Sequence, residues 1–254
     1  MSRIAAIALA TLSEAIRHRI LYLLLIFALV LIIFSRVLSL LTVGEDVKIV
    51  KDIGLTAINL FGLMIALFVG VGILFREMER RTVQTTLATP VARWEYVLGK
   101  FSGLAAAITV NTALMAVTLF GLLVWREAFS PSMIVAVYSL WIELVFITAA
   151  AVFFASFSTP IFTALFTAAT WVVGHLAWSL LLLEERLPEG IARGLVRAVY
   201  LMLPDLEYGD VRSLAVHGLP IPFERVALAS VYELGYAALL LMVACLAFRR
   251  RDLV

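Results

Sequence analysis

The chain alternates long apolar stretches with shorter polar segments. The apolar stretches cover residues 20–41, 54–75, 101–124, 132–155, 161–183 and 226–248. A helix needs about 20 apolar residues to cross the roughly 30 Å hydrocarbon core of a bilayer. Strands of a membrane barrel would alternate polar and apolar residues, whereas "LYLLLIFALVLIIF" is apolar throughout. The pattern therefore predicts an all-α integral membrane protein with six transmembrane helices.

Composition agrees with this prediction. Hydrophobic residues make up 63% of the 254 residues and charged residues only 15%, and the mean hydropathy is +1.06. These values lie far from those of soluble domains. The single cysteine, Cys245, lies in an apolar stretch, so an internal disulfide is excluded. A net charge of +2 does not favour a nucleic acid partner, and no second domain is expected within residues 1–254.

The first segment, residues 1–19, has the pattern of an amphipathic helix. Ile4 and Ile7 share one face, and Arg3 and Arg17 lie on others. We expect an interfacial elbow helix that lies along the membrane and leads into the first span. A secretory signal peptide is excluded, because charged residues follow the short apolar part where a small-residue cleavage site would stand.

The polar segments between spans differ in length. Two are predicted to be short connectors, residues 42–53 and 125–131, and one is much longer, residues 184–225. Within the long segment, Ile191 and Leu195 fall on one helical face and Arg193 on another. This spacing predicts an interfacial helix that ends before Pro204.

Charge is distributed unevenly between the two sides of the membrane. Six spans put both termini on one side, and that side holds eleven basic and five acidic residues. The other side holds eight basic and eleven acidic residues. Because Lys and Arg near span ends favour the cytoplasm, we expect both termini and residues 76–100 to be cytoplasmic.

The segment "REMERRTVQTTLATPVARWEYVLGK", residues 76–100, is the most polar stretch between two spans. Residues 76–89 contain good helix formers, and Pro90 should end that helix. Trp94, Tyr96 and Lys100 are residue types that anchor a span at the headgroup zone. The segment therefore predicts a cytoplasmic helix followed by an anchored re-entry. A plain solvated loop is the alternative.

This segment carries a resemblance. The series Glu79, Thr82, Leu87, Pro90, Arg93, Gly99 and Lys100 resembles the motif of ATP-binding-cassette (ABC) type 2 export permeases, which also follows their second span. The six spans, the amphipathic first segment, the outer stretch "LMLPDLEYGDV" and the ending "FRRRDLV" extend the similarity over nearly the whole chain.

The resemblance implies a permease subunit in the cytoplasmic (inner) membrane of a bacterium, whose coupling helix docks into a separate ATPase. The residues expected to make that contact are Glu77, Glu79, Arg80, Arg81, Thr82, Gln84, Thr85, Pro90 and Arg93. The implied partners are two ATPase subunits, a second permease copy or a homologous permease, membrane lipids and a periplasmic accessory protein.

ATP and Mg²⁺ would be bound by the ATPase partner, and no cofactor or metal is expected in this chain. The pair Gly99–Lys100 is followed by Phe101 instead of Ser or Thr, and no Gly stands five residues before Gly99. The phosphate-binding loop of a nucleotide site is therefore absent. This chain is expected to be a non-catalytic subunit.

Polar groups inside the spans are candidates for a translocation path, because a charge at the bilayer centre costs about 2.5–3.5 kcal/mol on insertion scales. Glu143 and Glu233 lie within spans, and Asn59 and Asn111 are expected to join helices by hydrogen bonds. Arg36 lies near a span end and can extend to the surface. His175 has no metal-ligand partner at the right spacing.

Two other functions stay open at this point. A carrier driven by an ion gradient would use Glu143 and Glu233 as a proton relay and would not need residues 76–89. A membrane enzyme would have to use Ser102 in "GKFSG" with His175 as its base, but nothing in the sequence would orient that base. The substrate cannot be read from the apolar walls of the spans.

Overall fold

The computed structural model describes residues 3–39, 46–73, 75, 92–187 and 190–250. Helices make up its regular structure, and no strand occurs among these residues. Six helices are long and apolar enough to cross a membrane. The predicted all-α membrane fold is therefore confirmed.

The six spanning helices follow the predicted apolar stretches. They are α2 (Arg19–Ser39), α3 (Asp46–Ile65, continued to Ile73), α6 (Arg93–Trp125), α7 (Pro131–Ala155), α8 (Pro160–Arg186) and α11 (Phe223–Arg250). The chain must satisfy its backbone hydrogen bonds internally in lipid, so each apolar stretch becomes helical along its length. Proline stands at the first position of α7 and of α8, where its missing N–H costs nothing.

Two spans begin earlier than predicted. The connector predicted at 42–53 is wrong from Asp46 onward, because α3 already begins there. Asp46 pairs with Arg126, and the buried Lys51 donates to Ser130 Oγ over 3.5 Å. Because these polar side chains find protein partners, the helix extends beyond its apolar part.

The third span shows the same effect. Its helix, α6, begins at Arg93 and not at 101, since Glu95 accepts a 2.8 Å hydrogen bond from the backbone N–H of Ala92. The Glu95 carboxylate accepts from a backbone N–H that has no partner within the helix. Its negative charge also interacts favourably with the positive end of the helix dipole.

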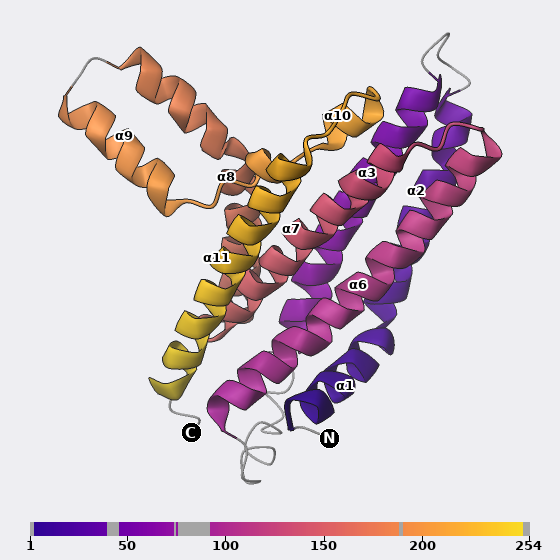
Figure 1. Cartoon of the computed structure of the whole chain (residues 1–254). Helices are drawn as coiled ribbons and strands as arrows, with labels where there is room; N and C mark the ends of the chain where they lie inside the picture. The colour runs from indigo at the N-terminus through magenta and orange to yellow at the C-terminus, as the bar shows by residue number, and fades with distance from the viewer. Residues whose placement is uncertain (1–2, 40–45, 74, 76–91, 188–189, 251–254) are drawn as a thin grey trace.

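The helices form a bundle with two distinct ends (Figure 1). The end called here the termini end holds the short helix α1 (Arg3–Ile16), the start of α6 and the last turns of α11. The opposite end, called the α10 end, holds α10 (Arg212–Val216) and the start of α3. Residues 76–91, which lie outside the described part, connect α3 to α6.

The core of the bundle is built around α7. Residues 142–152 of α7 are all buried, so neighbours surround this helix on every side. It packs against α11, α6, α8 and α3. By contrast, α2 leaves Leu23, Ile26 and Ile33 more than half exposed, as expected for a helix that faces lipid.

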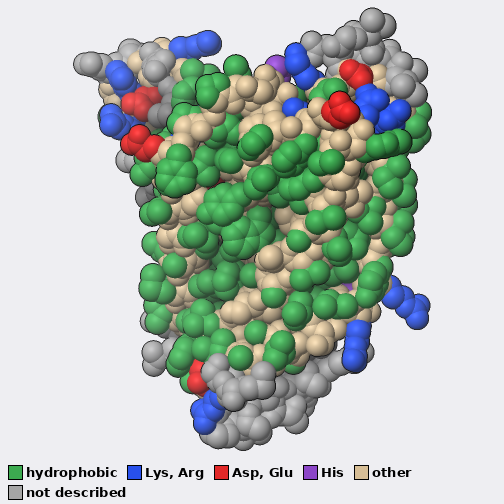
Figure 2. Space-filling view, turned by 45° about the vertical axis from the view of Figure 1, so that its right-hand side comes forward, with side chains coloured by type: hydrophobic (Ala, Val, Ile, Leu, Met, Phe, Trp, Pro, Cys, Tyr) green, Lys and Arg blue, Asp and Glu red, His purple; other side chains and the backbone are tan. Residues whose placement is uncertain are grey.

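The surface has the layered character of a membrane protein. In Figure 2 the Lys, Arg, Asp and Glu side chains gather at the two ends of the visible face, and hydrophobic side chains fill the broad zone between them. Apolar residues can remain exposed there only if lipid covers them.

A π-helical turn, η1 (Ala66–Gly70), interrupts α3 near the termini end. Such turns are rare and occur often at functional sites. Ala66, Val69 and Gly70 are buried within it, and the helix then resumes through Ile73. The irregular turn therefore lies in the last part of the span that leads into residues 76–91.

The long segment after α8 contains α9 (Ile191–Met202), and this helix ends just before Pro204. In Figure 1 the end of α8 and α9 form a hairpin that leans away from the other helices. Ile191 and Leu195 are exposed, whereas Arg193 Nε lies 3.5 Å and Arg197 Nη1 3.7 Å from Glu184 Oε1. The basic face of α9 thus turns toward α8.

Candidate functional site

A group of polar side chains is enclosed between α7, α8, α11 and the segment 205–212. Glu143 of α7 is only 4% exposed. Trp171 Nε1 donates a 2.7 Å hydrogen bond to its Oε1, and His175 Nε2 lies 3.7 Å from the same oxygen. The deepest predicted intramembrane acid is therefore held by an indole donor from the neighbouring span.

His175 is oriented by its own helix. Its Nδ1 lies 3.1 Å from the carbonyl oxygen of Trp171 one turn earlier. A carbonyl oxygen can only accept, so the proton of this bond belongs to Nδ1. The buried Nε2 makes no hydrogen bond with any described residue. His175 thus places its second nitrogen toward Glu143.

Asp210 and Arg212 form a tight ion pair above this point. Arg212 Nε donates to both carboxylate oxygens of Asp210, over 2.9 and 2.8 Å, and the backbone N–H of Arg212 donates to Oδ1 over 2.8 Å. Burial alone would raise the pKa of Asp210, but the hydrogen bonds and the charge of Arg212 outweigh it and hold that pKa below its ordinary value.

The charge of Glu143 also affects the pKa of Arg212. Burial would lower the pKa of Arg212, but the hydrogen bond and charge of Asp210, followed by the charge of Glu143, raise it instead. Arg212 therefore lies in the field of an acid on the 205–212 segment and of an acid inside a span.

Glu233 of α11 closes the group from the other side. It is 3% exposed, and its Oε2 has no hydrogen-bond partner among the described residues. The backbone of Gly209 lies so close that an added Cβ would overlap Glu233 Oε1. A side chain at position 209 would therefore require the Glu233 carboxyl group to shift.

We call Glu143, Trp171, His175, Gly209, Asp210, Arg212 and Glu233 the polar cluster. It fastens the 205–212 segment to three spans. Further contacts hold the same segment: Leu206 N donates to Gly174 O over 3.1 Å, and Asp205 N donates to Tyr232 Oη over 3.1 Å.

The end of α9 joins this arrangement through Asp205. Tyr200 Oη donates a 2.9 Å hydrogen bond to Asp205 Oδ2, and Tyr208 N donates to Oδ1 over 3.2 Å. Burial and this hydrogen bond raise the pKa of Tyr200 to about 12. One carboxylate therefore organises the turn that returns the chain from α9 to α11.

A cleft of about 490 Å³ opens beside the polar cluster at the α10 end. Its lining residues are Lys48, Ile49, Asp52, Asp210, Arg212, Ser213, Val216 and His217. The cleft lies between the start of α3 and α10, so the Asp210–Arg212 pair has one side toward the buried acids and one toward this opening.

The two predicted asparagines behave differently from expectation. Asn59 and Asn111 are buried, but Asn111 Nδ2 donates to Ala107 O of its own helix over 2.8 Å. Neither side-chain atom of Asn59 finds a hydrogen-bond partner among the described residues, and Asn111 Oδ1 finds none either. The prediction that they join helices by hydrogen bonds is wrong, and no hydrogen bond in the described part links them to Glu143 or Glu233.

A second group of contacts lies at the termini end, where α6 begins. Tyr96 stacks on Phe248 of α11, with ring centroids 5.6 Å apart and planes inclined by 16°. Arg93 Nη1 donates to the carbonyl oxygen of Phe248 over 3.1 Å. Lys100 Nζ lies 5.7 Å from the centre of the Tyr96 ring.

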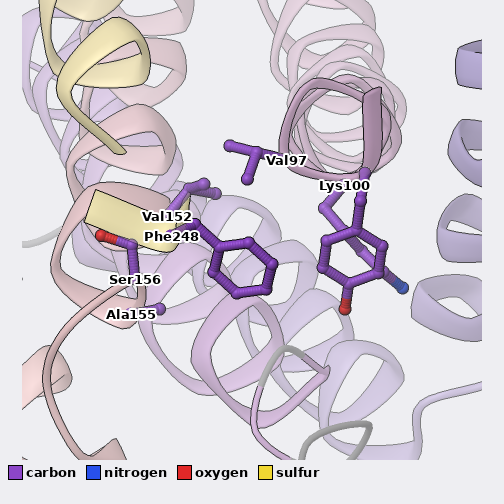
Figure 3. Close-up of a pocket in the computed structure, with 7 residues that line it drawn as sticks. Val97, Lys100, Val152, Ala155, Ser156 and Phe248 are labelled. Carbon is purple, nitrogen blue, oxygen red and sulfur yellow. The ribbon is translucent and has the colours of Figure 1, made fainter. Parts of the chain in front are cut away.

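These contacts correct two predicted interface anchors. Tyr96 is 5% and Lys100 3% exposed, because both pack inside the protein where α6, α7 and α11 meet. Figure 3 shows the small cavity there, about 20 Å³, with Lys100 on one side and Ser156 on the other. Trp94, the third predicted anchor, is 49% exposed.

The first helix covers another face of the same part of α6. A Cβ on Gly99 would stand 2.7 Å from Ile7 Cβ, and one on Gly103 would stand 2.6 Å from Ala8 O. Arg3 Nη1 lies 3.8 Å from Glu95 Oε2. The two glycines therefore let α1 lie directly on α6.

Most of the predicted coupling residues lie outside the described residues. These are Glu77, Glu79, Arg80, Arg81, Thr82, Gln84, Thr85 and Pro90. Arg93 is described, and it contacts α11 as stated above. Sequence reasoning missed Trp171, Gly209, Asp210 and Arg212. The spacing Asp210-x-Arg212 within "LEYGDVR" is a local signal of an ion pair, but nothing in the sequence connects it to Glu143.

Among the residues that the structure describes, no three His, Cys, Asp or Glu side chains are placed together as metal ligands would be. A search for relatives finds no curated protein that matches the chain. The model of one family, described as "ABC-2 family transporter protein", matches residues 5–253. Given that match over nearly its whole length and the six spanning helices, the chain belongs to the ABC-2 transporter family.

Proposed function

We propose that this chain is the transmembrane permease subunit of an ABC exporter. It would couple ATP hydrolysis in a separate ATPase subunit to movement of a substrate across the cytoplasmic membrane. The match of the family over residues 5–253 carries the proposal. The chain itself would contribute no catalytic residue, and ATP and Mg²⁺ would bind to the partner.

The geometry of the bundle supports an ATPase contact at the termini end. Residues 76–91 connect α3 to α6 at the end that also holds α1 and the close of α11 (Figure 1). Basic residues outnumber acidic ones in the segments of this end. By the positive-inside rule, this charge bias supports a cytoplasmic position of the termini end, where it would reach an ATPase.

We assign the ATPase contact to residues 76–93, with the same residues that the family resemblance indicates. Charged and hydroxyl side chains such as Glu79 and Thr82 can make directional contacts with a moving partner. The complete transporter would hold two ATPase subunits and a second permease copy or a homologous permease. Lipids would cover the remaining apolar surface, and a periplasmic accessory protein could reach the α10 end.

The buried polar groups are assigned to the translocation path under this proposal. Glu143 and Glu233 lie where the 205–212 segment meets three spans, and Asn59 keeps unsatisfied amide atoms inside the bundle. A buried polar group without a hydrogen-bond partner destabilises the fold. Such groups inside a membrane therefore often mark the path of a substrate or ion.

The proposal is tested by co-expression with the ATPase encoded beside this gene. The two chains should copurify, and Glu79→Arg or Thr82→Trp should separate ATP hydrolysis from nucleotide-driven movement of the permease. Glu127→Arg is the matched control, because Glu127 is an exposed acid at the α10 end.

Copurification and coupling that are unchanged in both variants would remove residues 76–93 from the ATPase contact. Uphill transport by the purified chain alone, driven by an ion gradient in vesicles without ATP, would replace the exporter with the carrier considered above.

A further inference from the structure

The first turn of α6 is bonded to the last turns of α11. Arg93 and Tyr96 follow directly after residues 76–91 in the chain, and both contact Phe248. The guanidinium of Arg93 donates to the Phe248 carbonyl, and the Tyr96 ring lies against the Phe248 ring. The last residue of the proposed ATPase contact, Arg93, and Tyr96 just after it are thus tied to the sixth span.

The hydrogen bond to Phe248 links two helices that are far apart in the chain. Arg93 Nη1 donates over 3.1 Å to the carbonyl oxygen of Phe248, in the last described turns of α11. A hydrogen bond from a charged donor is stronger than one between neutral groups, so the guanidinium helps to hold α6 and α11 together at this point.

The packing leaves the first turns of α6 little freedom to slide. Helix α1 lies on Gly99 and Gly103, and α11 lies on Tyr96. Close packing makes such contacts switch between discrete arrangements, not deform gradually. A displacement of residues 76–92 must then either carry α11 along or break the contact with Phe248.

We propose that Arg93, Tyr96 and Phe248 form a joint that passes the movement of residues 76–92 to the sixth span as well as to the third. This inference rests on the function proposed above. We call the three residues the α6–α11 joint. Arg93 and Tyr96 act in it as positioning residues and do not touch substrate.

The joint has a consequence deeper in the bundle. Helix α11 runs without interruption from Phe248 to Glu233, a rigid distance of about 22 Å at 1.5 Å per residue. Glu233 supports Gly209 in the polar cluster. Movement that enters α11 at the termini end therefore reaches the 205–212 segment through one helix.

The test is hydrogen exchange of the full permease–ATPase complex, measured by mass spectrometry without nucleotide and with ATP and vanadate. In the wild type, exchange should change with nucleotide both at residues 93–100 and at residues 241–250. In Phe248→Ala the response at 93–100 should persist, and the response at 241–250 should fall about fivefold or more, as expected for loss of a stacked contact.

Two further variants separate a joint from a general packing role. Phe248→Tyr keeps the stacked ring and should respond like the wild type. Leu246→Ala removes a side chain that is 59% exposed on the same end of α11, and it should also respond like the wild type. Copurification of the ATPase with each variant shows that the complex still assembles.

The joint is overturned if residues 241–250 respond fully in Phe248→Ala, or if they do not respond in the wild type while residues 93–100 do. A wild-type chain that binds no ATPase, or whose two regions both ignore nucleotide, would instead contradict the proposed function and the joint with it.

Discussion

At the scale of single residues, Glu143 shows how the protein accommodates an acid within a span. A carboxylate that is 4% exposed needs donors, and Trp171 supplies one from the next helix. Leaving a buried acceptor without its donor costs about 1–3 kcal/mol. The indole is therefore as important to this position as the acid itself.

We expect Trp171→Phe to lower the free energy of unfolding by about 1–3 kcal/mol, because it removes the Nε1 donor and keeps an aromatic ring. Trp178→Phe is the matched control, since Trp178 lies on the same helix and is 52% exposed. The measurement is thermal unfolding of the purified protein in detergent. Equal stability of the two variants would show that the hydrogen bond to Glu143 contributes nothing.

The Asp210–Arg212 pair should make stability depend on pH. The pKa of Asp210 is held below its ordinary value, so the pair stabilises the folded chain at pH values above the unfolded pKa of about 3.9. That contribution is lost as the pH falls through the lower pKa of the folded state.

The melting temperature of the wild type should thus exceed that of Asp210→Asn by a constant amount from neutral pH down to about pH 5, and the difference should shrink below about pH 4. Glu127→Gln, at an exposed position, controls for the loss of one carboxylate. A difference that persists unchanged at about pH 3 would contradict the folded-state ion pair.

The sequence indicates some of these residues and hides others for a physical reason. Glu143 and Glu233 are conspicuous because an acid in an apolar stretch is costly wherever it points. Trp171 and Arg212 look ordinary in their own segments. Trp171 acquires its role from a contact with Glu143, 28 residues earlier in the chain. Arg212 acquires its role because the 205–212 segment folds back toward Glu143.

At the scale of elements, the packing of α1 on α6 depends on two glycines. Gly103 brings α6 within reach of the backbone of Ala8, which cannot move aside as a flexible side chain would. A substitution there must shift α1 itself. The contact between the amphipathic helix and the third span is therefore sensitive to a single methyl group.

Gly103→Ala should lower the free energy of unfolding by about 1–3 kcal/mol through overpacking. Gly121→Ala, on the same helix with nothing within 4 Å of the added Cβ, should be neutral or stabilising by up to about 1 kcal/mol. Thermal unfolding compares the two, and hydrogen exchange over residues 3–16 reports whether α1 loosens. Equal behaviour of both variants would exclude close packing at Gly103.

The elements themselves could be predicted because a bilayer allows few alternatives. Every apolar stretch of about 20 residues became a helix. The predicted boundaries are wrong at the starts of α3 and α6. Polar residues there are helical because other groups of the protein pair with them. Asp46 with Arg126 extends α3, and Glu95 with the N–H of Ala92 extends α6. Hydropathy alone cannot detect such partners.

At the scale of the whole molecule, the two groups of contacts lie at different depths of one bundle. The α6–α11 joint adjoins residues 76–91 at the termini end, and the polar cluster holds the 205–212 segment toward the other end. Helix α11 belongs to both. Under the proposed function, α11 would connect the ATPase contact with the 205–212 segment.

The most direct test of this account is photo-crosslinking in intact membranes, with a benzophenone amino acid introduced at position 82 or at position 127 of the full chain beside its ATPase. The account predicts an adduct with the ATPase from position 82 and none from position 127. An adduct from position 127, or the absence of one from position 82 in a complex that hydrolyses ATP, would contradict entry of the ATPase's movement through residues 76–91.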